Sequence, residues 1–128
     1  IKIEMIQEII KKYDYFSDAQ IKNVCYTYPT SQGANVVVQI ECCNTQNDYA
    51  WELINVVFND ITFIRFIGYG DSIGSVIDMA FIKNEEDEIV FDFFGLFDAD
   101  NQTLGENPES DFIIRCKKVD YQVIEVYK

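Results

Sequence analysis

The chain has 128 residues, of which 48% are hydrophobic and 15% aromatic, a composition typical of a single globular domain and not of a disordered chain. Its 22 acidic and 10 basic residues give a net charge of −12 at pH 7, which disfavours binding to nucleic acid or to an anionic membrane. Histidine is absent, which removes the commonest general base, the commonest zinc ligand and every Ser-His or Cys-His nucleophile.

Residues 1–12 place apolar side chains at helical spacing, at Ile3, Ile6, Ile9 and Ile10. Polar residues fill the opposite side. The pattern predicts an amphipathic helix of about three turns that packs on a sheet.

From Ala19 the apolar period changes to two, which predicts a strand that ends at Pro29. Residues 30–33 are typical of a turn. Alternating apolar positions at 36–43 predict a second strand, which ends at the turn-forming residues 44–48. Two strands joined by a short glycine-bearing turn predict a β-hairpin.

Residues 49–58 and 61–67 predict two further strands. The pair Asn59-Asp60 between them predicts a two-residue hairpin connection, because both residue types tolerate positive φ. Trp51 is expected in the core, as a lone tryptophan usually is. The aromatic residues of the first half are expected to pack at the junction of helix and sheet; they are Tyr13, Tyr15, Phe16, Tyr26 and Tyr28.

The second half predicts short strands between polar connections. A glycine-rich loop is expected at 68–75, and residues 76–82 fit either strand or helix. Strands are expected at 89–94, 111–116 and 121–126. The polar connections are expected at 84–88, 98–110 and 117–120. The spacing G-x-G-x-x-x-G at 68–74 misses the dinucleotide fingerprint by one residue, which favours a plain loop.

Together these elements predict one domain over residues 1–128 of the α+β class, mostly β. We expect the N-terminal amphipathic helix to pack on a curved antiparallel sheet, or on a two-sheet meander, of about eight strands.

The four cysteines, Cys25, Cys42, Cys43 and Cys116, all lie in apolar, strand-like runs. Adjacent Cys42 and Cys43 would point to opposite faces of a strand, so they cannot share a partner. This favours small core side chains over disulfides or a metal site, and hence a reducing, cytoplasmic location. No apolar run is long enough to predict a transmembrane helix.

One 31-residue segment, 84–114, carries ten acidic residues and no Lys or Arg, which leaves 12 acidic and 10 basic residues elsewhere. Charge separated in this way creates a field that attracts a basic protein partner. The predicted partner-binding residues are Glu85, Glu86, Asp87, Glu88, Asp92, Asp98, Asp100, Glu106, Glu109 and Asp111, with Phe94, Phe97 and Leu104 as buried anchors. The alternative is that the acids only keep an aromatic-rich protein in solution.

Two other classes of function stay open. In residues 98–109, acidic or amide side chains fall on positions 1, 3, 5, 9 and 12 of an EF-hand calcium loop. Thr103, however, stands at position 6, where that loop needs glycine, and Pro108 stands at position 11. An EF-hand is therefore excluded, while a looser calcium-binding loop or a small-molecule-binding β domain remains. The many carboxylates also leave a glycosidase-type hydrolase open. The sequence favours a protein with no enzymatic activity and no cofactor.

Three stretches resemble an immunity-protein-like family of bacterial toxin systems. They are the opening helix with Tyr13-Asp14-Tyr15-Phe16-Ser17-Asp18-Ala19-Gln20-Ile21, the apolar strand 36–40, and Trp51 followed by residues 56–66. The similarity covers the first half of the chain. It implies a small acidic β-rich domain that binds and neutralises a cognate toxin without catalysis. No site residue transfers by position, because such families share no catalytic residues.

Overall fold

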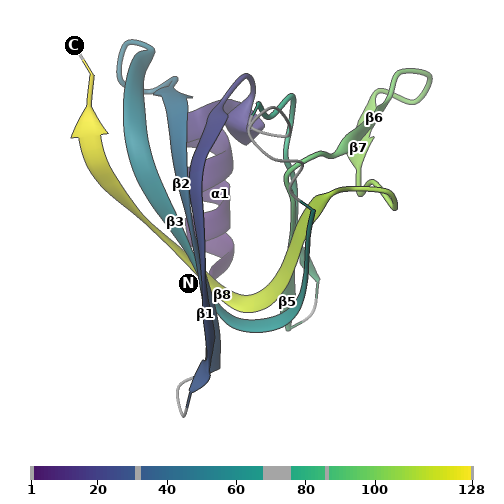
Figure 1. The fold of residues 1–128 in the computed structure, drawn as a ribbon. Coiled ribbons are helices and arrows are strands. Elements are labelled where there is room, and N and C mark those ends of the chain that lie inside the picture. The colour runs from purple at the N-terminus through teal and green to yellow at the C-terminus, as the bar shows by residue number, and fades with distance from the viewer. Residues whose placement is uncertain (1, 31–32, 68–75, 86, 128) are drawn as a thin grey trace.

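A computed structural model describes residues 2–30, 33–67, 76–85 and 87–127 (Figure 1). The chain begins with helix α1 (Lys2–Tyr13) and a short 3-10 helix, η1 (Asp14–Phe16). The strands are β1 (Gln20–Thr30), β2 (Gly33–Asn44), β3 (Ala50–Phe66), β4 (Phe81–Glu85), β5 (Glu88–Asp92), β6 (Leu96–Asp98), β7 (Thr103–Gly105) and β8 (Phe112–Val126).

Six strands form one antiparallel sheet in the order β1-β2-β3-β8-β5-β4, and β6 pairs with β7 in a separate hairpin. The long central strands β3 and β8 curve together, so the sheet wraps around α1 (Figure 1). The predicted α+β class, with an N-terminal helix on a curved antiparallel sheet, is confirmed.

The core lies between α1 and the concave face of the sheet. Alternation along β2 buries Val36, Val38 and Ile40 completely, and α1 adds Ile6 and Ile9. Four phenylalanine rings pack against one another in this core, with ring-centre separations of 4.2 to 6.1 Å; they are Phe58, Phe91, Phe93 and Phe112. Each such ring buries ~150–250 Å², which makes this cluster a principal source of stability.

The prediction of a hairpin at Asn59-Asp60 is wrong, because β3 runs unbroken through both residues. Asp60 does adopt a positive φ of 55°. The pairing of β3 with β8 then shifts register between Ile61 and Phe63. The local sequence therefore produces a β-bulge that bends the strand and not a turn that reverses it.

The turn predicted at residues 117–120 is also wrong, because β8 continues from Phe112 to Val126. Val119 in its middle is buried and pairs with Phe58, and Lys118 pairs with Asn59. The two predicted breaks thus lie opposite each other in one ladder. Cross-strand pairing keeps both strands extended where the sheet bends (Figure 1).

Elsewhere the predicted elements change in extent. The ambiguous segment 76–82 is an isolated bridge from Val76 to Gln20 followed by the start of β4. The connection predicted at 98–110 contains the last residue of β6 and all of β7, which pair as a hairpin. The described residues form eight strands, the number predicted, but two pairs of predicted strands have merged and β6 and β7 are new. The glycine-rich segment 68–75 lies outside the described residues.

Several side chains expected inside are on the surface. Trp51 is 41% exposed, so its expected place in the core is wrong. Tyr26 and Tyr28 are exposed as well, whereas Tyr13 and Phe16 are buried as predicted. Cys42 and Cys116 are core residues, but Cys25 is exposed on β1. Among the described helices, none combines the length and apolar character needed to cross a bilayer.

Candidate partner-binding surface

The acidic segment folds into two parts. The first is the turn between β4 and β5, with Glu85, Asp87 and Glu88. The second runs from β6 to the start of β8, and its β6–β7 hairpin projects away from the main sheet (Figure 1). Glu86 lies outside the described residues.

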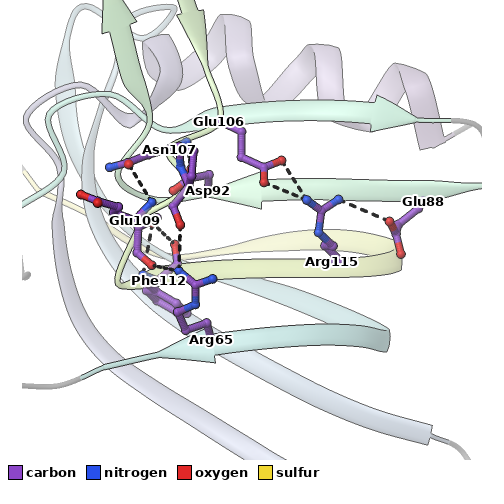
Figure 2. Close-up of polar contacts among 10 residues, drawn as sticks. Arg65, Glu88, Asp92, Glu106, Asn107, Glu109, Phe112 and Arg115 are labelled. Atoms are coloured by element: carbon purple, nitrogen blue, oxygen red, sulfur yellow. Dashed lines mark hydrogen bonds and ion pairs between the residues drawn. The ribbon is translucent and has the colours of Figure 1, made fainter.

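Arg115 of β8 joins the two parts (Figure 2). Its Nη2 donates to both carboxylate oxygens of Glu106, at 2.9 and 2.8 Å, and its Nη1 lies 3.5 Å from Glu88 Oε1. Glu88 also accepts a hydrogen bond of 2.6 Å from the Thr62 hydroxyl. One guanidinium therefore holds two carboxylates in place and neutralises one of their two charges.

Asp92 is fully buried, with an exposed fraction of 0%. Its carboxylate accepts hydrogen bonds from the backbone N–H of Phe94, at 3.0 Å, and of Asn107, at 2.7 Å (Figure 2). These bonds tie the end of β5 to the loop that follows β7. The assignment of Asp92 to a partner-binding surface is therefore wrong, because the fold uses its charge internally.

Arg65 of β3 holds the same loop from the other side. Its Nη1 donates to the carbonyl oxygens of Pro108, at 3.2 Å, and Ser110, at 3.0 Å. Both arginines of the chain thus contact the segment between β7 and β8 (Figure 2). Charge-assisted hydrogen bonds from both arginines therefore help to hold this loop.

The outer carboxylates lie on the β6–β7 hairpin and its connection to β8. Asp98, Asp100 and Glu109 are exposed, and Asp111 is half-buried. The carboxylate of Asp98 accepts hydrogen bonds from the backbone N–H groups of Asp100 and Asn101 and from the Asn101 amide. These bonds lower the pKa of Asp98, the Asn101 side chain contributing most. The tip therefore keeps its negative charge to lower pH than an ordinary aspartate.

Apolar side chains accompany these acids. Phe97 on β6 is 49% exposed, while Phe94 and Leu104 are half-buried. Leu96 is 57% exposed and was missed as a candidate anchor. Its position beside Phe97 in the sequence was the available signal. The hairpin thus combines anionic and apolar groups, as interface cores and rims do.

The folded chain brings basic side chains close to the β4–β5 turn. An open hollow of about 690 Å³ is lined by Lys83, Glu85, Asp87, Glu88 and Lys117. In the sequence these lysines flank the acidic segment, and in the structure they stand beside it. The β6–β7 side of the surface is therefore more uniformly negative than the β4–β5 side.

The calcium loop considered at residues 98–109 takes the form of a β-hairpin. Its first carboxylate, Asp98, is engaged by donors of its own turn. Over the ranges that the structure describes, no group of three or more acidic or cysteine side chains is placed to hold a metal ion.

Searches against protein-family models, curated proteins and solved structures found no significant match to this chain.

Proposed function

We propose that this chain is a non-catalytic binding protein of the immunity type, which acts in the cytoplasm and neutralises a basic toxin by direct contact. The contact surface comprises the β6–β7 hairpin, its connection to β8 and the adjoining β4–β5 turn. Its residues are Glu85, Asp87, Glu88, Asp98, Asp100, Glu106, Glu109 and Asp111, together with the apolar Leu96 and Phe97.

The observation that carries the proposal is the Arg115 clamp. Arg115 links Glu88 and Glu106, which come from the two acidic parts, through partly exposed ion pairs. The exposed carboxylates on either side therefore act on a partner together. A negative surface of this kind speeds encounter with a basic protein to ~10⁸–10⁹ M⁻¹s⁻¹ at low salt, against ~10⁵–10⁶ M⁻¹s⁻¹ without steering.

The apolar side chains support docking over a role in solubility alone. Acids that only keep a protein in solution gain nothing from neighbouring exposed hydrophobic groups, which promote association. Here Leu96 and Phe97 extend from the same hairpin as Asp98 and Asp100. In an interface, such side chains supply the buried anchors inside a charged rim.

The gene immediately upstream tests the proposal. We expect its product to be a basic protein that arrests growth when expressed alone, and we expect coexpression of this chain to restore growth. A harmless upstream product, or arrest that persists with this chain present, would contradict the proposal.

The surface itself is tested in the same growth assay with the variant Asp98→Lys/Asp100→Lys/Glu109→Lys. Rescue should be lost while the circular dichroism spectrum stays that of the parent, because these side chains are exposed and the hydrogen bonds of Asp98 are confined to its own turn. The matched control reverses three exposed acids outside this surface, Asp78, Asp120 and Glu125. Equal rescue by both variants would exclude the β6–β7 surface.

A further inference from the structure

A second concave site lies where α1 ends and the β2–β3 connection passes it. The groove holds about 240 Å³, and its lining residues are Tyr13, Asp14, Ser17, Asp18, Cys43, Thr45, Tyr49 and Trp51. Hydrogen bonds from Thr45 to the backbone carbonyl of Lys12, 2.8 Å from its N–H and 3.1 Å from its hydroxyl, join the two walls. The groove is therefore built from two segments that the fold locks together.

Two aromatic side chains on one wall are left open to solvent. Tyr49 is 69% exposed and Trp51 is 41% exposed. Trp51 lies opposite Cys43 in the β2–β3 ladder, and the Cys43 thiol donates a hydrogen bond of 3.3 Å to the Tyr49 carbonyl. The backbone that carries both rings is thus held in place, and aromatic rings bind cations over their faces.

The opposite wall carries two carboxylates. Asp14 and Asp18 are exposed, and both adopt a left-handed backbone, with φ of 48° and 60°. The described residues that line the groove include no Lys or Arg. A cation in the groove would meet aromatic rings on one side and negative charge on the other.

A third carboxylate lies behind the groove. Glu52 is buried and accepts hydrogen bonds of 2.8 Å from the hydroxyl of Tyr13, a lining residue, and from the side-chain amide of Asn44. Burial of the Cys43 thiol and, to a smaller extent, the nearby charge of Glu52 raise the pKa of Cys43 in the groove wall. The negative potential therefore reaches the groove from its interior side as well.

We propose that this groove binds the guanidinium group of an arginine side chain presented by a partner protein. Arginine suits these walls better than lysine, because its planar cation stacks on aromatic rings while its N–H groups donate to carboxylates. At about 240 Å³ the groove is smaller than the ~300–1,000 Å³ typical of small-molecule pockets, so it suits one side chain. The inference is independent of the acidic surface around β6 and β7.

Trp51 is the only tryptophan of the chain, so its fluorescence reports directly on the groove. The experiment titrates the full chain with a glycine-flanked single-arginine peptide at low salt. We expect a saturable change in fluorescence. We expect no saturation with the citrulline peptide, which keeps the shape and lacks the charge, and weaker binding of the lysine peptide.

The matched variants separate charge from folding. Asp14→Asn/Asp18→Asn should weaken binding of the arginine peptide by about fivefold or more, because asparagine keeps the shape and tolerates a left-handed backbone. The control, Asp120→Asn, removes an exposed charge on β8 and should bind like the parent. Equal responses to arginine and citrulline, equal binding of the lysine peptide, or unchanged binding by the double variant would overturn the proposal. None of these readouts depends on a toxin partner, so failure here is distinct from failure of the immunity function.

Discussion

The end of β5 and the β6–β7 hairpin lie within a few residues of each other in the chain and use aspartate in opposite ways. Asp92 is buried and accepts two backbone hydrogen bonds that hold the loop after β7. Asp100 is exposed at the hairpin tip. The difference shows that an acidic segment is not one structural unit: burial and hydrogen bonding decide which charges hold the fold and which face solvent.

The largest expected effect comes from removing the buried charge. Asp92→Ala leaves the N–H groups of Phe94 and Asn107 without their acceptor, and should lower the free energy of unfolding by about 2–4 kcal/mol. Asp100→Ala is the matched control and should change it by less than about 0.5 kcal/mol. Urea denaturation measures both. Equal loss in the two variants would contradict the distinction between them.

The junction between the two regions should be nearly as sensitive. A Cβ added at Gly95 would lie 2.9 Å from Phe81 Cβ and 3.1 Å from the Phe81 backbone nitrogen. Gly95→Ala should therefore cost about 1–3 kcal/mol of unfolding free energy through overpacking. Gly105→Ala is the control, because its nearest contact would be an ordinary 4.0 Å. A harmless Gly95→Ala would show that β4 and the hairpin are not packed this closely.

A smaller loss is expected when the clamp between the two acidic parts is removed. Arg115→Met should destabilise the chain by only about 1 kcal/mol, because its ion pairs are partly exposed. The same variant leaves Glu88 and Glu106 uncompensated, so salt should raise its stability more than that of the parent. Arg115→Lys keeps the charge and is the control. Denaturation at two salt concentrations decides between these outcomes.

The smallest expected effect concerns the pH response of the hairpin tip. The pKa of Asp98 is lowered from its ordinary value of 3.8 by hydrogen bonds from Asn101. A carboxyl with a lowered pKa stabilises the folded form above 3.8, and that contribution is lost as pH falls through the folded pKa. A pH titration followed by NMR should show the Asp98 carboxyl of the parent titrating below 3.8. Asn101→Ala should raise the pKa of Asp98; an unchanged pKa would show that the Asn101 hydrogen bonds do not lower it.

The sequence predicted the helix, the β2 alternation and the antiparallel class, because hydrophobic periodicity directly reflects burial. It failed at Asn59-Asp60 and at residues 117–120, where polar residues interrupt β3 and β8 without reversing them. Each interruption lies opposite the other in the ladder, and a single-strand pattern contains no information about its partner. Local turn propensity was overridden by cross-strand pairing.

The candidate surface was predicted in part. The sequence identified the acidic segment and Phe97, but it could not separate Asp92 from its exposed neighbours, because burial depends on the distant loop at Asn107. It also could not place Arg115 between Glu88 and Glu106, which are 18 residues apart in the chain. Trp51 was misplaced because its exposure depends on how the end of α1 meets the β2–β3 connection.

The rate at which this chain associates with the proposed basic toxin tests the central claim most directly. Stopped-flow measurements at about 10 mM and about 150 mM salt compare the parent with Asp98→Lys/Asp100→Lys/Glu109→Lys, since the Debye length falls from ~30 to ~8 Å over this range. We predict that the parent associates much faster at low salt and that the variant loses this advantage. Equal rates for the two proteins at both salt concentrations would contradict docking through this surface.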